Sequence, residues 1–125
     1  MKRNFYDGLI KDLLDKKAYQ LAQVIYSEKK REKFDVTLQD HIVGFEIFGA
    51  QSNIDEYKEI FSEVIKDGSD YKIDQNLCEE VARTMLYFKA DSDQRDVLEM
   101  TDTMKELIFD RQIRLSSKLL ERIVM

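Results

Sequence analysis

Two groups of basic side chains have the chemistry and the spacing to hold a phosphate backbone. The first lies in the stretch YSEKKREKFDVTLQD, residues 26–40, among as many acidic residues. The second lies near the end of the chain at intervals of three, four and four residues, which aligns its members along one face of a helix. The candidate nucleic-acid-binding residues are therefore Lys29, Lys30, Arg31 and Lys33, together with Arg111, Arg114, Lys118 and Arg122.

The first basic group also has a structural interpretation. Cations in the last turn of a helix face its negative end and stabilise it, so we expect these residues to end a helix. Phe34 is then expected to pack under the next helix pair, and Asp35 to cap the helix that follows. A phosphate contact further requires that the fold turn these lysines toward the same groove as Arg114 and Lys118.

The residue types that serve most often in catalysis are sparse. His41 is the only histidine, and its neighbours Ile42 and Phe45 favour a packing role over that of a general base. Cys78 is the only cysteine, so no intramolecular disulfide can form, and Leu77 beside it favours burial over a reactive thiol. We therefore expect a protein that is not an enzyme.

Sites for cofactors and metals are not predicted either. The chain has no glycine-rich phosphate loop, which argues against nucleotide hydrolysis. The loop DGSDYKID, residues 67–74, offers oxygen ligands but lacks the spacing and terminal glutamate of an EF-hand. Acidic pairs such as Glu79 with Glu80 and Asp91 with Asp93 are expected to be solvated helix faces or helix caps.

Length and composition indicate one domain. A chain of 125 residues with 43% apolar content can bury a single modest core. No run of 18 apolar residues is present, and the opening MKRNFYDGLI reaches an acid before any signal-like apolar segment forms, so neither a membrane span nor a secretory signal is expected. We expect a soluble intracellular protein.

The distribution of helix breakers predicts an all-α fold. Proline is absent, glycine occurs four times, and strict alternation of apolar and polar residues never persists. Apolar periodicity places helices at about 4–15, 18–32, 37–49, 53–67, 75–89, 93–107 and 112–124.

A repeat of about 35 residues relates the first helix pair to the second. A shift of 35 aligns Ile10 with Phe45, Leu13 with Phe48, Tyr19 with Ile54, Ala22 with Tyr57, Ile25 with Ile60, and Tyr26 with Phe61. Apolar-Asp connectors recur at Phe34-Asp35, Ile73-Asp74 and Phe109-Asp110. We expect a short α-solenoid of three helical hairpins, units 4–35, 36–74 and 75–110, plus a capping helix at 111–125. A plain seven-helix bundle and a piece of a longer solenoid are the alternatives.

The first unit, FYDGLIKDLLDKKAYQLAQVIYSEKKREKFD, resembles a pentatricopeptide repeat: an aromatic residue, then Leu-Ile, a later Leu, a small residue in the second helix, and a terminal Asp. The second unit has Tyr57 where that family prefers a small residue, and the proline usual before the terminal Asp is missing. Tetratricopeptide repeats are a close competitor. The resemblance implies binding of single-stranded RNA, with Gly8 and Asp40 as candidate base-reading positions, and a mitochondrial or other organellar location.

Charge along the chain favours a different partner. Residues 1–34 carry a net charge of +4, residues 35–110 carry −12 and residues 111–125 carry +3. Because phosphate contacts supply most non-specific affinity for nucleic acid, a strongly acidic middle opposes RNA binding. The second hypothesis is therefore a protein-binding adaptor whose acidic surface meets a basic protein or peptide. The resemblance tips the balance slightly toward RNA, and both functions fit a subunit of a larger complex.

Overall fold

The computed structural model describes residues 2–67, 75–85, 88 and 94–111, and within them it confirms the all-α prediction. No strand occurs in this part of the chain. Six helices do: α1 (Lys2–Asp15), α2 (Tyr19–Arg31), α3 (Leu38–Ala50), α4 (Ile54–Asp67), α5 (Gln75–Met85) and α6 (Gln94–Arg111). Residues 86, 87 and 89 of the predicted fifth helix lie outside the described residues. So does the capping helix predicted at 111–125, apart from Arg111, the last residue of α6.

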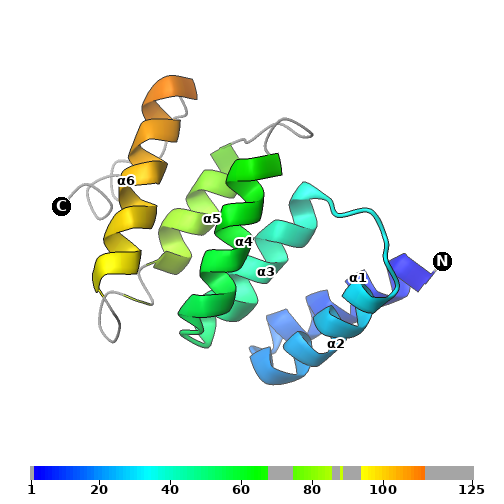
Figure 1. Cartoon of the computed structure of the whole chain (residues 1–125). Coiled ribbons are helices and arrows are strands. Elements are labelled where there is room, and N and C mark those ends of the chain that lie inside the picture. Colours follow the sequence, from blue (N-terminus) through cyan, green and yellow to red (C-terminus); the bar gives the residue numbers. More distant parts are fainter. Residues whose placement is uncertain (1, 68–74, 86–87, 89–93, 112–125) are drawn as a thin grey trace.

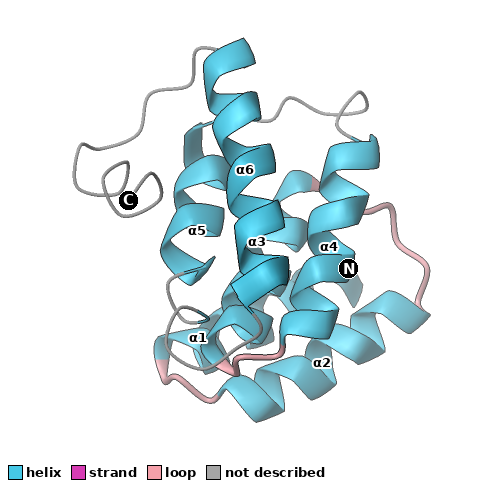
Figure 2. Ribbon diagram, turned by 60° about the vertical axis from the view of Figure 1, so that its left-hand side comes forward, coloured by secondary structure: helices cyan, strands magenta, loops and turns pink. Residues whose placement is uncertain are grey.

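The helices pack mainly on near neighbours in the chain. α1 and α2 pair at one end of the molecule, α3 packs on α2, α4 and α5, and α6 lies against α4 and α5 (Figures 1 and 2). α3 has the most apolar sequence of these helices, LQDHIVGFEIFGA, which suits its place between three others.

The turns of the first two hairpins are alike and lie 35 residues apart. Lys17 and Ser52 both adopt left-handed backbone conformations, with φ of 57° and 54°. Each turn is closed by a backbone N–H that reaches back to a carbonyl in the last turn of the preceding helix: Ala18 to Leu13 at 2.8 Å, and Asn53 to Phe48 at 2.9 Å. This is the Schellman pattern of helix termination. The 35-residue repeat thus holds for two hairpin turns, while the stacking of hairpins into a solenoid stays a prediction.

The cap of α3 is Thr37, so the prediction that Asp35 caps this helix is wrong. The Thr37 hydroxyl accepts a hydrogen bond from the Asp40 backbone N–H at 3.2 Å, and the Asp40 carboxylate accepts one from the Thr37 N–H at 2.9 Å. This reciprocal capping box satisfies two N–H groups that the helix leaves free. Asp35 lies two residues too early, and its carbonyl oxygen instead accepts a hydrogen bond from Arg3.

Tyr57 joins α4 to α5 in the core. Its side chain is fully buried, and its ring lies 4.9 Å from the rings of both Phe45 and Phe88, measured between centroids. Its hydroxyl lies 2.6 Å from Thr84 Oγ1 and 3.0 Å from the carbonyl oxygen of Val81, to which it donates. The tyrosine that departs from the pentatricopeptide pattern therefore fills the junction between two helices and has its polar atom satisfied there.

Gly44 permits the close approach of α2 and α4 to α3. A Cβ atom at this position would lie 2.6 Å from Ile60 Cδ1 and 2.8 Å from the Tyr26 hydroxyl oxygen. Both distances are far below a normal van der Waals contact, so a larger residue would force the packed side chains of Tyr26 and Ile60 to move. Gly8, exposed on α1, has no atom within 4 Å of such a Cβ.

We predict opposite effects for alanine at these two glycines. Gly44→Ala should lower the free energy of unfolding by about 1–3 kcal/mol, because it overpacks a filled core. Gly8→Ala should raise it by up to about 1 kcal/mol, because alanine loses less backbone entropy in a helix. Urea denaturation followed by circular dichroism measures both, and equal effects of the two substitutions would contradict the packing at Gly44.

Candidate functional site

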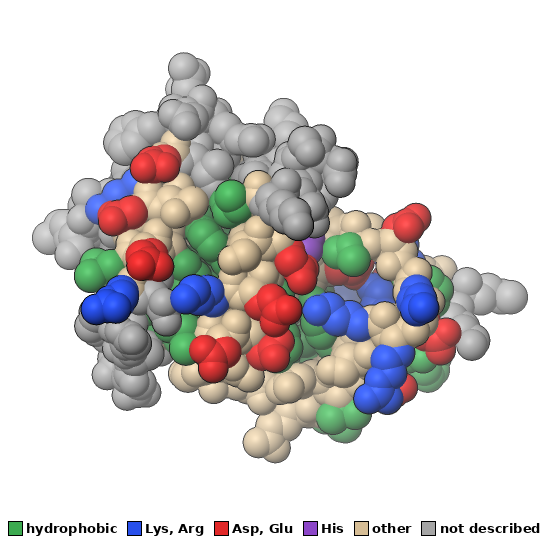
Figure 3. Space-filling model, in the orientation of Figure 1, with side chains coloured by type: hydrophobic (Ala, Val, Ile, Leu, Met, Phe, Trp, Pro, Cys, Tyr) green, Lys and Arg blue, Asp and Glu red, His purple; other side chains and the backbone are tan. Residues whose placement is uncertain are grey.

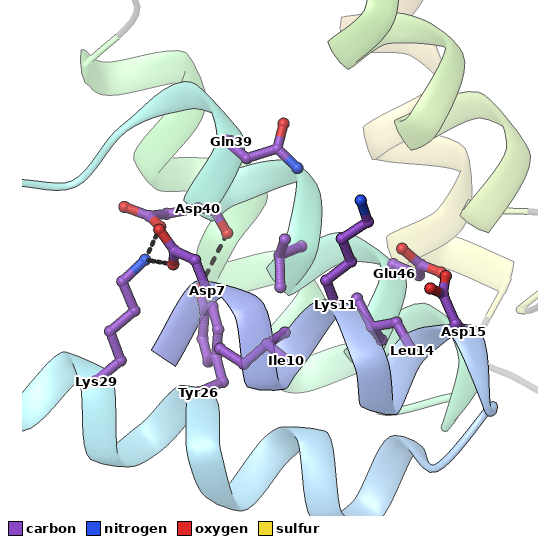
Figure 4. A pocket seen from close by; sticks show the side chains of 11 residues that line it. Asp7, Ile10, Lys11, Leu14, Asp15, Tyr26, Lys29, Gln39, Asp40 and Glu46 are labelled. Atoms are coloured by element: carbon purple, nitrogen blue, oxygen red, sulfur yellow. Dashed lines mark hydrogen bonds and ion pairs between the residues drawn. The ribbon is translucent and has the colours of Figure 1, made fainter. Parts of the chain in front are cut away.

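A cavity of about 350 Å³ opens between α1, α2 and α3 (Figure 4). Its wall combines apolar side chains with charged ones of both signs. The lining residues are Asp7, Ile10, Lys11, Leu14, Asp15, Tyr26, Lys29, Gln39, Asp40, Val43 and Glu46. We call it the α1–α3 cavity.

An ion-pair cluster closes one end of the α1–α3 cavity. The Lys29 side chain is 8% exposed, and its ammonium donates to Asp7 Oδ1 at 2.5 Å and to Asp40 Oδ1. Asp40 Oδ2 also accepts from Arg3 at 3.1 Å. Because these pairs run between α2 and both α1 and α3, they fix the positions of three helices around the cavity.

The cluster shifts the titration of Asp40. Burial raises the pKa of its carboxyl, but the hydrogen bond from Lys29 and those from Thr37 outweigh burial and hold the pKa below the ordinary value of 3.8. Asp40 is therefore ionised at neutral pH. Burial, with the Asp40 carboxylate nearby, raises the pKa of the Tyr26 hydroxyl, so this hydroxyl stays protonated.

The other end of the α1–α3 cavity carries two carboxylates without ion partners among the described residues. Asp15 is exposed on α1 and Glu46 is half-buried on α3, and both side chains line the cavity, as does Lys11 (Figure 4). Apolar Ile10 and Leu14 lie between this end and the ion-pair cluster. An apolar floor with two carboxylates at one end suits an apolar group that carries a cation.

The four residues of the first basic group lie in different environments. Lys29 is held in the ion-pair cluster, so a phosphate contact by its ammonium would require an ion pair to break. Lys30 is exposed with its ammonium 5.4 Å from the centroid of the Tyr26 ring, and Arg31 is exposed with an ion pair to Glu28 at 2.9 Å. Lys33 is exposed just after α2. As expected, Lys29, Lys30 and Arg31 lie in the last turn of that helix. The same prediction is wrong for Lys33, because α2 ends at Arg31.

The second basic group cannot be placed in the same way. Arg111 ends α6, and nothing is described of its side chain, whereas Arg114, Lys118 and Arg122 lie outside the described residues. Its role in phosphate binding stays a prediction. Of the two candidate base-reading positions, Gly8 is exposed on α1 and the Asp40 carboxylate is engaged in ion pairs.

The histidine and the cysteine are both buried, as their neighbours in the sequence predict. His41 is 3% exposed and Cys78 is 1% exposed. Among the described residues, no group of three or more His, Cys, Asp or Glu side chains could hold a metal ion. No helix in the same part of the chain is long and apolar enough to cross a membrane.

One prediction about the acidic residues is wrong. Glu80 is not on a solvated face: it is 5% exposed, on the side of α5 that packs against α3. Glu79 beside it is half-buried. The sequence pattern Glu80-x-x-Arg83 is typical of an exposed ion pair on a helix, so only the packing of α5 on α3 reveals the burial.

Sequence reasoning also missed the carboxylates of the α1–α3 cavity. A signal for them was present, because Asp7, Lys11 and Asp15 follow one another at intervals of four residues and so share one face of α1. Gln39, Val43 and Glu46 have the matching spacing on α3, but their pairing across the cavity depends on how the two helices meet.

Comparisons of the chain with protein-family models, with curated proteins and with solved structures find no match. The resemblance of the first unit to pentatricopeptide repeats therefore stays a prediction.

We predict that Asp40 makes the stability depend on pH in the acid range. Because its pKa is lower in the folded state than in the unfolded chain, its contribution is complete well above the unfolded value of 3.8 and is lost as the pH falls through the lower folded value. The free energy of unfolding should fall on acidification, and Asp40→Asn should flatten that dependence. Urea denaturation at a series of pH values measures it. Asp12→Asn, an exposed carboxylate on α1, is the control, and an unchanged slope in Asp40→Asn would contradict the assignment.

We predict that neighbouring lysines on α2 differ in their effect on stability. Lys29→Met should lower the free energy of unfolding by about 3 kcal/mol, because it leaves Asp7 and Asp40 without their shared cation. Lys30→Met should lower it by less than about 1 kcal/mol, since only an exposed contact with an aromatic ring is lost. Thermal and urea denaturation compare the two, and similar losses would show that the ammonium of Lys29 is not buried as described.

Proposed function

We propose that the protein is a non-catalytic helical-repeat binding module, and that its α1–α3 cavity takes a basic, amphipathic segment of a partner protein. The observation that carries this proposal is that Asp15 and Glu46 line one end of a cavity whose floor is apolar. Two carboxylates beside an apolar floor attract a cation that is carried on an apolar side chain.

Surface charge supports the same partner. The outward side of α4 carries exposed Asp55, Glu56 and Glu59, with half-buried Glu63. In Figure 3 acidic side chains gather in the middle of the face, over the part of the molecule where Figure 1 shows α4. Such a field attracts a basic segment over a distance and opposes a phosphate backbone.

The burial of potential catalytic groups supports a non-catalytic role. With His41 and Cys78 nearly inaccessible, neither of these two side chains can meet a substrate without local opening of the fold. The charged residues of the α1–α3 cavity are better suited to recognition than to proton transfer, because Asp40 is held ionised by its cations.

An RNA-associated function is the second candidate. It is favoured by the exposure of Lys30, Arg31 and Lys33 at the end of α2 and by the net charge of +4 over residues 1–34. It is opposed by the engagement of Lys29 in the ion-pair cluster. In the RNA case, the single strand would follow the basic surface of the first hairpin and the stripe at the end of the chain.

The proposal predicts that one pair of carboxylates governs peptide affinity. The probe is a fluorescein-labelled peptide with leucine and arginine at helical spacing, titrated by fluorescence anisotropy. The double variant Asp15→Asn, Glu46→Gln should bind it about tenfold more weakly, since it loses two charge-assisted hydrogen bonds. The double variant Asp12→Asn, Asp102→Asn removes the same charge from exposed positions elsewhere and should change affinity by less than about twofold.

Equal losses in the two double variants would show that attraction is non-specific and would overturn the proposal. A parallel titration with a pool of short single-stranded RNAs at two salt concentrations tests the second candidate. RNA binding that weakens with salt and is lost in Arg114→Glu, Lys118→Glu, with no peptide binding, would replace the protein-binding function by the RNA-associated one.

A further inference from the structure

The side chain of Glu80 leaves one buried oxygen without a hydrogen bond. Its Oε2 pairs with Arg83, whose side chain is 61% exposed, whereas Oε1 is buried and has no hydrogen-bond partner. A buried carboxylate oxygen without a donor is costly, and such atoms are rare in native proteins. The position therefore favours any ligand that brings a donor to Oε1.

Glu80 lines a second cavity, on the side of α3 that faces α5. We call it the α3–α5 cavity; its volume is about 480 Å³. It offers oxygen acceptors from side-chain carboxylates and amides, and an apolar patch from one aliphatic side chain. The lining residues are Gln39, Ile42, Asn76, Glu79, Glu80 and Arg83.

The chemistry of the α3–α5 cavity selects a cationic donor. Glu79 and Glu80 give it two carboxylates, and the one cation among its lining residues, Arg83, is already paired with Glu80. An anion would meet both carboxylates. A metal ion is a poor fit, because no cluster of three or more ligating side chains occurs among the described residues. A guanidinium offers several N–H donors in one plane, and that plane can lie against an apolar wall such as Ile42.

We propose that the α3–α5 cavity is a binding site for an arginine side chain, with Glu80 Oε1 as the principal acceptor and the amide oxygens of Gln39 and Asn76 as further ones. Because Oε1 is closed to solvent, the Glu80 carboxylate must turn toward the cavity on binding, and the guanidinium then supplies the donor that Oε1 lacks. Arg83 keeps its bond to Oε2, so both oxygens of the buried carboxylate are satisfied in the complex.

The two cavities adjoin each other. Gln39 lines both the α1–α3 cavity and the α3–α5 cavity, so the N-terminal turn of α3 forms the wall between them. A single basic segment that crosses this turn can place one cation near Asp15 and Glu46 and an arginine at Glu80. This extension rests on the proposed function; the arginine site itself does not, because it follows from the buried oxygen and its cavity.

The arginine site is tested first without any peptide. Wild-type protein labelled with ¹³C in its side-chain carboxyl groups is titrated with Nα-acetyl-argininamide and followed by NMR. A saturable shift of the Glu80 carboxyl resonance is expected, with no saturable shift at Glu99, an exposed glutamate on α6. Nα-acetyl-lysinamide should bind more weakly, since its ammonium lacks the planar donor set. No shift at Glu80, or equal shifts at both glutamates, would overturn the site.

The peptide titration then separates the site from the proposed function. Glu80→Gln should weaken binding of the arginine-containing peptide about tenfold. It should not lower the thermal midpoint, because it removes a buried charge that is only half paired. Asn76→Leu, at an exposed position on the rim, should also weaken binding and gives a second variant if Glu80→Gln folds poorly.

If Glu80→Gln binds the peptide normally while Asp15→Asn, Glu46→Gln does not, the proposed function stands and the arginine site falls. If wild-type protein binds no peptide, the proposed function falls, and the NMR titration alone decides the arginine site.

Discussion

The buried ammonium of Lys29 constrains the whole N-terminal half of the molecule. A charge removed from water must be compensated by nearby opposite charges, or the fold loses several kcal/mol. The compensation comes from one carboxylate on α1 and one on α3, so the three helices have little freedom to slide past one another. The same cluster closes one end of the α1–α3 cavity, so the shape of the cavity depends on these ion pairs.

The junction between the second hairpin and α5 is held by different chemistry. There the ring of Tyr57 packs between Phe45 and Phe88, and its hydroxyl satisfies backbone and side-chain groups of α5. Shape matters also where α2 and α4 pack on α3, since Gly44 leaves room there for the ends of the Tyr26 and Ile60 side chains. The junction between the first hairpin and α3 therefore depends on ionised side chains and is sensitive to pH. The junction at Tyr57 depends on shape and is sensitive to changes in side-chain size.

The positions of the helices could be predicted from the sequence, because they depend on residues close together in the chain. Absence of proline, periodic apolar residues and a recurring turn determine α1 to α4 within a few residues. The cap at Thr37 was missed because two residues near each other, Asp35 and Thr37, can both cap, and only the second has an acid three residues on that completes the capping box. The partners of Lys29 and the burial of Glu80 depend on contacts between helices, and such contacts cannot be inferred from spacing along one helix.

Packing between near neighbours also determines which parts of the chain can open separately. The free energy of local opening differs between the segments of a folded protein. The polar contacts that join the first hairpin to α3 include the ionised Asp40, whereas the contacts around Tyr57 are uncharged. Acid strong enough to protonate Asp40, at a pH below 3.8, therefore weakens the attachment of α1 and α2 while α3, α4 and α5 stay packed. The backbone amides of the first hairpin would then exchange with solvent ahead of those in the centre, and the α1–α3 cavity would lose its shape before the α3–α5 cavity does.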